Sequence, residues 1–180
     1  MSDIATVRAE VIEKYKELCG KINHTPNTSF VRTFSNATVK SFYLDLVFRG
    51  NDKLHFGNRF SDRDIILLSS ALEGHEKLIR HVDLSFNEIS DVGIEIFAKY
   101  LEKCPNIESL NLQGNSLGPT SAEKISAALA SVESLKYLNF QHNKVGTAGA
   151  IVNIELFRQS QRTCCSPAMK SKECPLKNSI

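Results

Sequence analysis

The feature that most constrains this chain is a frame of apolar residues that recurs at a fixed spacing. The frame is Ile79-x-x-Val82-x-Leu84-x-x-Asn87-x-Ile89. It returns, in two steps of 28 residues, as Ile107-x-x-Leu110-x-Leu112-x-x-Asn115-x-Leu117 and as Leu135-x-x-Leu138-x-Phe140-x-x-Asn143-x-Val145. Matched positions in three copies predict a repeat protein in which each copy buries its apolar face against the next.

Each copy begins with a short strand and a turn. Val82 and Leu84 alternate along the chain, so both side chains point to one face of a strand, which we expect to be the interior. An asparagine follows where the chain leaves the strand and its backbone groups lose their partners. Because a side-chain amide both donates and accepts hydrogen bonds, we interpret these asparagines as a structural ladder. The ladder consists of Asn87, Asn115 and Asn143.

The second half of each copy has helical periodicity. Apolar residues at i, i+3 and i+7 form one stripe. The stripe consists of Ile94, Phe97 and Leu101 in one copy and of Ala122, Ile125 and Leu129 in the next. Ser90 and Asp91 suit the start of the first helix, and Gly118-Pro119-Thr120 opens the second. The sequence therefore predicts an α/β horseshoe with parallel strands inside the curve and helices outside.

An earlier, irregular copy precedes these three. Ile65, Leu68 and Leu72 have the helix spacing, 29 residues before Ile94. Its strand has two candidates. Leu54-x-Phe56 lies at the nearer spacing, whereas Phe42-x-Leu44-x-Leu46 has the more strand-like composition. We favour the second, which leaves a long loop over residues 47–59.

The N-terminal segment predicts a capping helix over residues 3–18. One helix face carries Ile4, Val7, Val11, Tyr15 and Leu18. Gly20 is expected to stop the helix, and residues 20–38, rich in Asn, Thr and Ser, to form a connector. Because the first repeat of a solenoid exposes an open apolar face, we interpret the helix as a cap. The alternative is an amphipathic helix for a partner.

The C-terminal segment departs from the pattern. The next copy would begin near residue 163, and none of its five frame positions fits. The predicted domains are thus a helical cap and connector over residues 1–38, about four repeats over 39–158 with the first irregular and the last incomplete, and a disordered tail over 159–180. A truncated isoform, a gene-model artefact or a changed reading frame is our hypothesis for the last 30 residues.

The repeat residues carry a family resemblance. Residues 78–87 and 111–119 resemble the ribonuclease-inhibitor-like leucine-rich-repeat family, whose period and full helix are similar. Residues 50–54, and the gap to Ile65, resemble the irregular first repeat of one branch of that family. The resemblance implies a longer, non-enzymatic protein of germ and stem cells, with a cytoplasmic or nucleolar location. It identifies no binding residues.

Composition narrows the classes of partner. A net charge of +2 is too small to favour nucleic acid or an acidic membrane. No apolar stretch is long enough to span a bilayer, and the N-terminus shows no signal peptide, so we expect an intracellular chain. Five cysteines, at positions 19, 104, 164, 165 and 174, do not match zinc-ligand spacing. We therefore expect no metal and no cofactor.

The concave strand face is the predicted partner-binding surface. Residues 28 apart occupy equivalent positions in successive repeats and form columns across the sheet. The exposed columns are His81, Ser109 and Tyr137; Asp83, Asn111 and Asn139; Ser85, Gln113 and Gln141; and, in the loop after the strand, Phe86 and His142. Tyr137 and Phe86 are the residue types that anchor protein partners. Two interpretations of Phe86 stay open, because the ring could instead pack on the loop, with the rest of the surface merely solvated.

Catalytic constellations are not apparent. His81 and Asp83 could form a dyad, but no nucleophile is placed beside them by the sequence. The prediction is a non-catalytic protein-protein interaction scaffold. One alternative is a regulator of a small GTPase that uses Arg49 and Arg59, which flank the long loop. Another is a truncated product without independent function.

Overall fold

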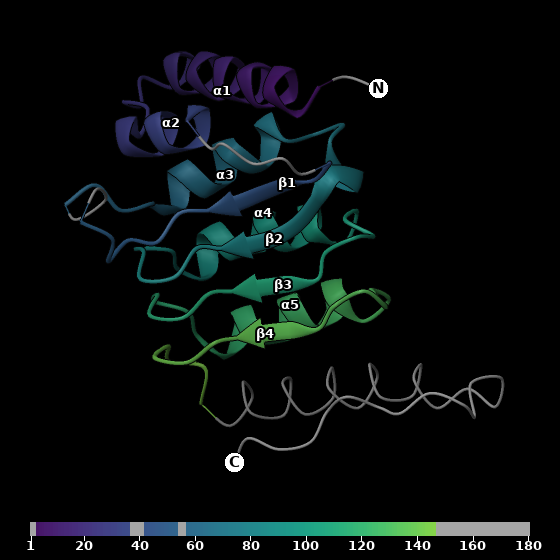
Figure 1. Cartoon of the computed structure of the whole chain (residues 1–180). Helices are drawn as coiled ribbons and strands as arrows, with labels where there is room; N and C mark the ends of the chain where they lie inside the picture. Colours follow the sequence, from purple (N-terminus) through teal and green to yellow (C-terminus); the bar gives the residue numbers. More distant parts are fainter. Residues whose placement is uncertain (1–2, 37–41, 54–56, 147–180) are drawn as a thin grey trace, which may run out of the picture.

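Four parallel strands form one sheet in chain order (Figure 1). The computed structural model describes residues 3–36, 42–53 and 57–146. The strands are β1 (Leu44–Val47), β2 (Ile79–Asp83), β3 (Ser109–Asn111) and β4 (Tyr137–Asn139). Val82 lies opposite Leu110, which lies opposite Leu138, so the 28-residue step of the sequence is the register of the sheet.

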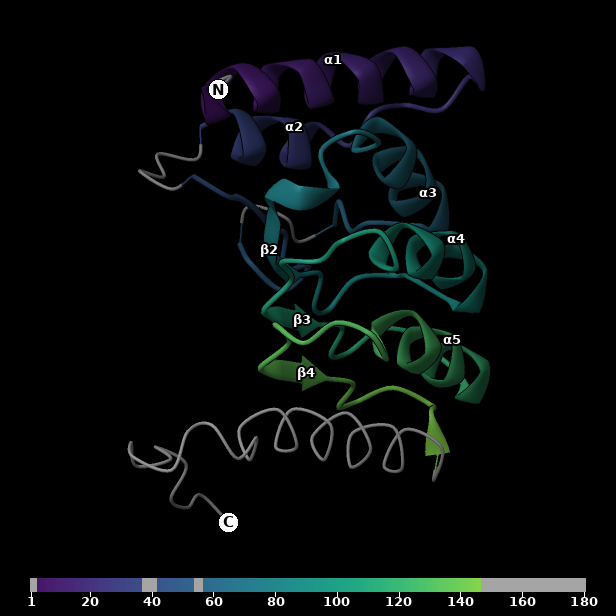
Figure 2. The ribbon, with the colours of Figure 1, turned by 90° about the vertical axis from the view of Figure 1, so that its right-hand side faces the viewer.

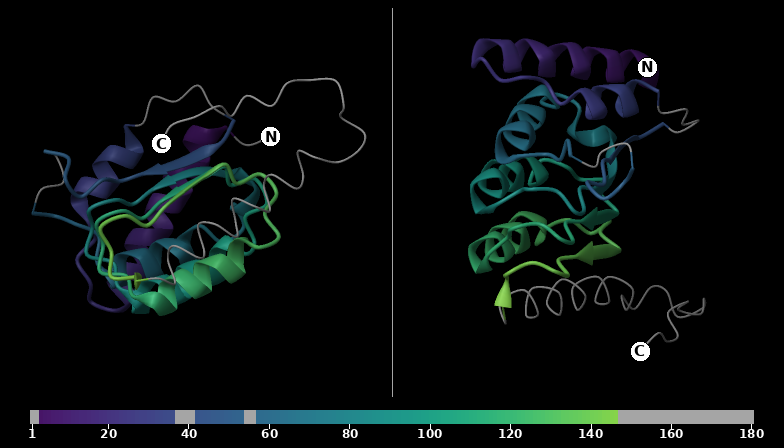
Figure 3. Two further views of the ribbon diagram at one scale, coloured as in Figure 1. Left: turned by 90° about the horizontal axis from the view of Figure 1, so that it is seen from below. Right: turned by 90° about the vertical axis from the view of Figure 1, so that its left-hand side faces the viewer.

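Three helices lie side by side behind this sheet. They are α3 (Asp62–Ala71), α4 (Asp91–Leu101) and α5 (Pro119–Leu129), and a short 3-10 helix, η1 (Glu76–Leu78), precedes β2. Figure 2 shows the helices on one side of the molecule and the strands on the other, and the left view of Figure 3 shows the two layers end on. The predicted architecture, parallel strands on one side and helices on the other, is confirmed.

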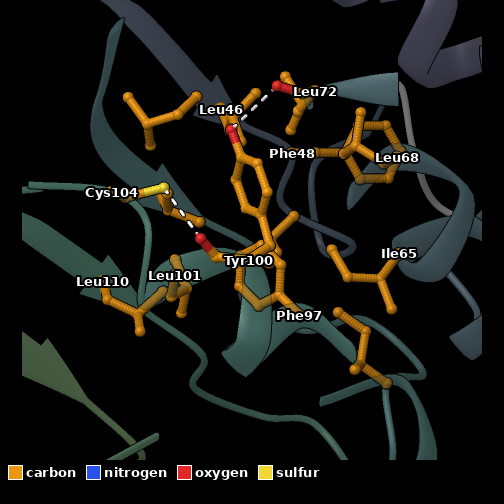
Figure 4. Packing of buried hydrophobic residues seen from close by; sticks show 14 of the residues in the cluster. Leu46, Phe48, Ile65, Leu68, Leu72, Phe97, Tyr100, Leu101, Cys104 and Leu110 are labelled. Atoms are coloured by element: carbon orange, nitrogen blue, oxygen red, sulfur yellow. Dashed lines mark hydrogen bonds between the residues drawn. The ribbon is translucent and has the colours of Figure 1, made fainter. Parts of the chain in front are cut away.

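The core lies between the two layers. All six predicted stripe residues of α4 and α5 are at most 1% exposed, and so are Val82 and Leu84 beneath them. Tyr100 crosses the interior between neighbouring repeats, where its hydroxyl donates to the carbonyl oxygen of Leu72 at 3.5 Å (Figure 4). Such interdigitated packing ties each repeat to the next.

The first repeat follows the frame in a different register from the predicted one. The strand begins at Leu44, so Phe42, which the favoured candidate Phe42-x-Leu44-x-Leu46 includes, lies before it and is 85% exposed. Leu46 pairs with Val82, which gives a step of 36 residues. The frame of this repeat is therefore Leu46-x-Phe48-x-x-Asn51, the same as Val82-x-Leu84-x-x-Asn87. The rival strand over residues 54–56 lies outside the described residues.

The extra residues of the first repeat lie in one place. The backbone N–H of Phe60 donates to Asn87 Oδ1 at 3.0 Å, just as that of Ile89 donates to Asn115 Oδ1 at 3.2 Å. Phe60 thus occupies the last apolar position of the frame. All but one of the extra residues consequently fall between Asn51 and Phe60, in the loop that the sequence predicted as irregular.

Two helices cover the N-terminal end of the stack. They are α1 (Ile4–Lys21) and α2 (Thr28–Ser35), and α1 packs against α2 and α3 (Figure 1). The expected stop at Gly20 is wrong, because Asn23 takes the left-handed conformation, with φ of 52°, and ends the helix. The N–H of His24 then donates to the carbonyl of Cys19 at 2.9 Å, which is the usual closure of such an end.

Helix α2 lies where the sequence predicted a connector. The side chain of Asn27 accepts the N–H of Phe30 at 2.9 Å and so caps the helix. Phe30 and Phe34 are buried one turn apart on its inner face. The polar residues Asn27, Thr28 and Ser29, whose composition is typical of a loop, form the start of helix α2. The expected division at residue 38 stays a prediction. The end of the expected incomplete last repeat, beyond residue 146, and the expected disordered tail lie outside the described residues.

Candidate interaction surface

The sheet face opposite the helices is uncovered by any helix or strand of residues 3–36, 42–53 and 57–146 (Figure 3). We call it the open sheet face. It consists of Asp45, Val47, Arg49, His81, Asp83, Ser109, Asn111, Gln113, Tyr137, Asn139 and Gln141. A loop column at the strand ends, Gly50, Phe86, Gly114 and His142, borders it.

One column of the open sheet face is occupied by the chain's own turns. Asp83 Oδ1 accepts the N–H of Ser85 at 3.2 Å, and Asn111 Oδ1 accepts that of Gln113 at 3.2 Å. Asn139 Oδ1 accepts the N–H of Gln141 at 2.9 Å. These Asx turns close the strand ends. The Oδ1 atoms of Asp83, Asn111 and Asn139 thus stabilise the turns, and the partner contacts predicted for these residues stay a prediction.

Asp83 is also neutralised within the chain. The Nε of Arg49 donates to Asp83 Oδ2 at 2.6 Å, and the hydroxyl of Ser85 donates to Asp83 Oδ1 at 2.7 Å. Burial alone raises the pKa of Asp83, but the hydrogen bonds from Ser85 and Arg49 outweigh it and hold the pKa below its usual value. Ser85 is only 2% exposed, so its predicted place on the surface is wrong.

Both arginines of the GTPase-regulator alternative take part in ion pairs. Arg49 lies on Asp83, as described above, and Arg59 Nη1 lies 3.9 Å from Glu88 Oε1. A catalytic arginine has to reach out to a bound nucleotide. The geometry therefore adds no support to this alternative.

His81 lies beside a serine that the sequence did not connect with it. The Nδ1 of His81 is 2.9 Å from Ser109 Oγ, on the neighbouring strand. A serine nucleophile needs, besides a base, donors for the oxyanion that forms. Backbone N–H groups inside a parallel sheet already donate to the next strand. We therefore interpret the pair as a cross-strand hydrogen bond of the open sheet face.

The ring of Phe86 packs on the loop of the next repeat. Phe86 has φ of 58°, and a Cβ placed on Gly114 would lie 2.6 Å from Phe86 Cδ1. A Cβ on Gly50 would lie 1.9 Å from the carbonyl oxygen of Phe86. Gly114 thus leaves room for the half-buried ring, and Gly50 leaves room for the backbone carbonyl of Phe86. This favours the loop-packing interpretation of Phe86 over the partner anchor.

Two exposed apolar side chains lie on the open sheet face. Tyr137, which the sequence predicted, is 50% exposed, and Val47, which it missed, is 45% exposed. Asn139 Nδ2 donates to the hydroxyl of Tyr137 at 3.1 Å and so helps to fix the ring. Once Leu46-x-Phe48 is recognised as the first frame, Val47 falls on the exposed face by alternation.

The described part of the chain contains neither an exposed cysteine nor a cluster of metal-ligating side chains. Burial raises the pKa of Cys104 to about 12 and also raises that of Cys19. Both thiols are free and buried. The described residues hold no group of three potential metal-ligating His, Cys, Asp or Glu side chains, and none of their helices is both long and apolar enough to cross a membrane. Cys164, Cys165 and Cys174 lie outside the described residues.

Comparisons with known proteins agree with the repeat geometry. Residues 76–98, 103–126 and 133–152 match the family model described as Leucine Rich repeat. Protein NLRC5 of Ictalurus punctatus is 31% identical over 91 residues, and Protein NLRC5 of Mus musculus is 30% identical over 103 residues. These matches cover 51% and 57% of this chain and 5% of each relative. The chain therefore spans only a small part of the length of these relatives.

A solved structure titled Leiomodin-1 Actin-Binding Site 2 (ABS2) aligns with a TM-score of 0.47 and 16% identity. The alignment covers 88% of this chain and 73% of that chain. The matched repeats coincide with β2, α4, β3, α5 and β4, where strand and helix alternate. The chain has the leucine-rich-repeat fold, and three of its segments match the repeat model of that family.

Proposed function

We propose that this chain is a non-catalytic scaffold that binds another protein on the open sheet face. The observation that carries the proposal is the exposure of Tyr137 and Val47, at 50% and 45%, on a face that no described helix or strand covers. Exposed Tyr is frequent among the residues that dominate binding energy at protein interfaces. The surface therefore offers apolar anchors at both edges of a polar sheet.

The polar side chains between these anchors are already fixed. Cross-strand hydrogen bonds join His81 to Ser109, at 2.9 Å, and Asn139 Nδ2 to Gln113 Oε1, at 3.2 Å. Side chains that are ordered before binding lose little conformational entropy when the partner arrives. Such preorganisation suits a scaffold that presents a rigid surface.

The location and the narrower relationship are part of the proposal. Residues 40–150 resemble leucine-rich-repeat-containing protein 34, on the strength of the runs at 78–87 and 111–119 and of the irregular first repeat. This would place the chain in the cytoplasm or nucleolus of germ and stem cells. Imaging of a tagged chain in germ cells tests it, and a purely membrane-bound signal would contradict it.

Affinity purification with mass spectrometry tests the scaffold role. The bait is the full chain, compared with a Tyr137→Ala plus Val47→Ser variant. We expect a specific partner to fall at least about tenfold with the variant, because several kcal/mol of interface energy often depend on few residues. The control is Val92→Ala on the convex helix α4, where Val92 is 64% exposed.

The result has two informative outcomes, provided that circular dichroism shows both variants folded. A partner lost with the double variant and kept by Val92→Ala supports the open sheet face. Partners that bind all three baits equally would contradict it. The GTPase-regulator alternative stays a separate prediction, which an assay of GTP hydrolysis with candidate small GTPases would test.

A further inference from the structure

We propose that the partner presents a carboxylate, from aspartate or glutamate, to a cluster of hydrogen-bond donors at the end of the open sheet face formed by β3 and β4. The donor cluster consists of the Tyr137 hydroxyl, the Gln113 side-chain amide and the Lys136 ammonium. Its residues lie in or beside β3 and β4, which are neighbours in the sheet (Figure 1). This inference rests on the proposed function and adds the chemistry of the group that the surface receives.

The backbone fixes the orientation of the Asn139 side chain. Its Oδ1 atom accepts the N–H of Gln141 at 2.9 Å, in the Asx turn described above. A backbone N–H can only donate, so the side-chain atom that faces it has to be the oxygen. The Nδ2 group of Asn139, which only donates, therefore faces the two neighbouring side chains, Tyr137 and Gln113.

Both neighbouring side chains have to accept from that Nδ2 group. Asn139 Nδ2 donates to the hydroxyl oxygen of Tyr137 at 3.1 Å and to Gln113 Oε1 at 3.2 Å. The hydroxyl proton of Tyr137 consequently points away from Asn139, and Gln113 keeps its Nε2 group, which only donates. The order of hydrogen bonds that the backbone sets thus leaves donors for the partner.

Both donors are within reach of a partner. Tyr137 is 50% exposed. The Nε2 group of the half-buried Gln113 makes no hydrogen bond in the described part of the chain and is accessible to solvent. Because the oxygens of Tyr137 and Gln113 both lie within 3.2 Å of Asn139 Nδ2, one group of the partner can meet both side chains.

Lys136 adds a positive charge to the two neutral donors. It directly precedes Tyr137, and its side chain is 71% exposed. Its Nζ lies 2.8 Å from Glu108 Oε2, while Arg80 Nη2 lies 2.6 Å from Glu108 Oε1, so two cations share one carboxylate. An ammonium carries three N–H donors, and Glu108 takes one of them. The other two can donate to an acceptor of the partner.

The acids of the described part of the open sheet face do not repel an acidic partner at this end. Asp83 lies 2.6 Å from the guanidinium of Arg49, and Asp45 lies in β1, at the other edge of the sheet. A carboxylate has two oxygens that accept and do not donate, and its hydrogen bonds are stronger than those of a neutral acceptor. It therefore matches the donor cluster better than a peptide carbonyl does.

Peptides selected without bias on the full chain test the inference. The probes are dodecapeptides from phage display on the immobilised protein, synthesised and titrated by calorimetry. We expect them to carry an aspartate or glutamate whose replacement by asparagine or glutamine weakens binding at least about tenfold. Tyr137→Phe, which removes only the hydroxyl and changes no charge, should weaken the acidic peptide at least about threefold. The two losses should not add, because they remove the same contact.

Asn139→Asp gives a second readout, because it reverses the order of hydrogen bonds. It keeps an oxygen for the N–H of Gln141 but replaces Nδ2 by a second acceptor, toward which the Tyr137 proton and the Gln113 amide then turn. The acidic peptides should lose at least about tenfold in affinity. A new selection on this variant should enrich lysine or arginine in place of the acid. A loss of folding would not produce such a reversal, and circular dichroism checks the fold.

The matched control for charge is Lys99→Gln on the convex helix α4, where Lys99 is 65% exposed. Lys136→Gln should weaken the acidic peptides at least about threefold, and Lys99→Gln less than about twofold. Equal losses with both variants would mean that the peptides respond only to the overall charge, and would overturn the inference.

Two further outcomes separate this inference from the proposed function. Peptides that lose affinity with Tyr137→Ala but keep it when their acids are replaced by amides overturn the carboxylate inference and leave the open sheet face in place. Peptides insensitive to Tyr137→Ala overturn the inference and count against the open sheet face as well. A selection that enriches no peptide overturns the inference, while the affinity purification still decides the proposed function.

Discussion

At the scale of single residues, three asparagines join the repeats through their side-chain amides. Asn115 Nδ2 donates to the carbonyls of Leu84 and Leu112, at 2.9 and 3.0 Å, and Asn115 Oδ1 accepts the N–H of Ile89 at 3.2 Å. Asn87 and Asn143 make the equivalent contacts in their own repeats. Each asparagine thus satisfies buried backbone groups of two successive repeats.

Asn115→Ala should lower the free energy of unfolding by about 3 kcal/mol, because it leaves several buried backbone groups without partners. Urea denaturation measures the loss. Asn106→Ala is the control, since Asn106 is exposed and donates one hydrogen bond, to the carbonyl of Lys77 at 2.7 Å. We expect about 0.5 kcal/mol for that variant. Equal losses would show that the ladder does not carry the stability assigned to it.

A buried carboxylate joins the N-terminal helices to the first repeat. Asp64, only 4% exposed, accepts from Tyr15 at 2.7 Å, from Ser61 Oγ at 2.6 Å and lies 2.9 Å from His24 Nε2. Burial alone raises the pKa of Asp64, but the hydrogen bonds from Ser61, His24 and Tyr15 outweigh it and lower the pKa. The ionised form is therefore the one that the fold stabilises.

Asp64→Asn should destabilise the chain at neutral pH by about 2 kcal/mol. Because the folded pKa lies below the unfolded value of about 3.9, the carboxylate's contribution is present above that value and is lost as the pH falls through the folded pKa. The gap between parent and variant should consequently narrow from pH 5 to pH 3 in urea titrations. A gap that widens over this range would contradict the assignment, and Glu123→Gln provides a control without a buried partner.

At the scale of elements, the spacing of the helices depends on residues at their first turns. Asp62 Oδ1, in α3, accepts the N–H of Ser90 at 2.7 Å and that of Gly93 at 3.1 Å, both at the start of α4. Asp91 in turn accepts the N–H of Gly118, at the start of α5, at 2.8 Å. α3 and α4 therefore each carry an acid that accepts from the first backbone N–H groups of the next helix, where a negative charge is favoured by the helix dipole.

Two glycines inside helices should respond oppositely to alanine. A Cβ on Gly93 would lie 2.7 Å from Ile65 Cγ2 and 2.5 Å from Asp62 Oδ1, whereas a Cβ on Gly20 would meet nothing within 4 Å. Gly20→Ala should stabilise by about 0.5–1 kcal/mol through helix propensity. Gly93→Ala should destabilise by about 1–3 kcal/mol through the forced separation of α3 and α4. Thermal unfolding of both variants checks the signs, and a stabilising Gly93→Ala would show that the helices can move apart freely.

At the scale of the whole molecule, an aromatic cluster fastens the N-terminal helices to the stack. Phe30 of α2 lies 5.1 Å from Phe60 and 6.0 Å from Phe48, both in the first repeat, between ring centroids. It also lies 5.4 Å from Tyr15 of α1 and 5.2 Å from Phe34. Because the first repeat has no preceding copy, these helices cover the apolar surface that a copy would cover.

Phe30→Ala should lower the free energy of unfolding by about 3–5 kcal/mol, because it opens a cavity where the cap meets the first repeat. Hydrogen exchange should show protection lost in α1, α2 and β1 before β3. Phe42→Ala is the matched control, since Phe42 is 85% exposed, and should change stability by less than about 0.5 kcal/mol. Uniform loss of protection across all strands would mean that cap and stack unfold as one unit.

The sequence by itself determined the three regular repeats. Each residue of a solenoid contacts its counterpart one period along the chain, so the spacing of Val82, Leu110 and Leu138 already states the register of the sheet. The helix stripes follow for the same reason, because local periodicity and tertiary contact coincide. The first strand was predicted at nearly the right place, but from a frame that began two residues too early.

Only the tertiary structure decided the features that depend on contacts without a fixed spacing. Asp64 meets Tyr15 from a helix 49 residues away, and Phe30 meets Phe60 across the loop of the irregular repeat. No periodic spacing in the sequence connects such pairs. For this reason the sequence predicted a connector where the structure has helix α2. The role of Asp83, which the chain neutralises, likewise follows from where Arg49 folds back, at 2.6 Å from Asp83.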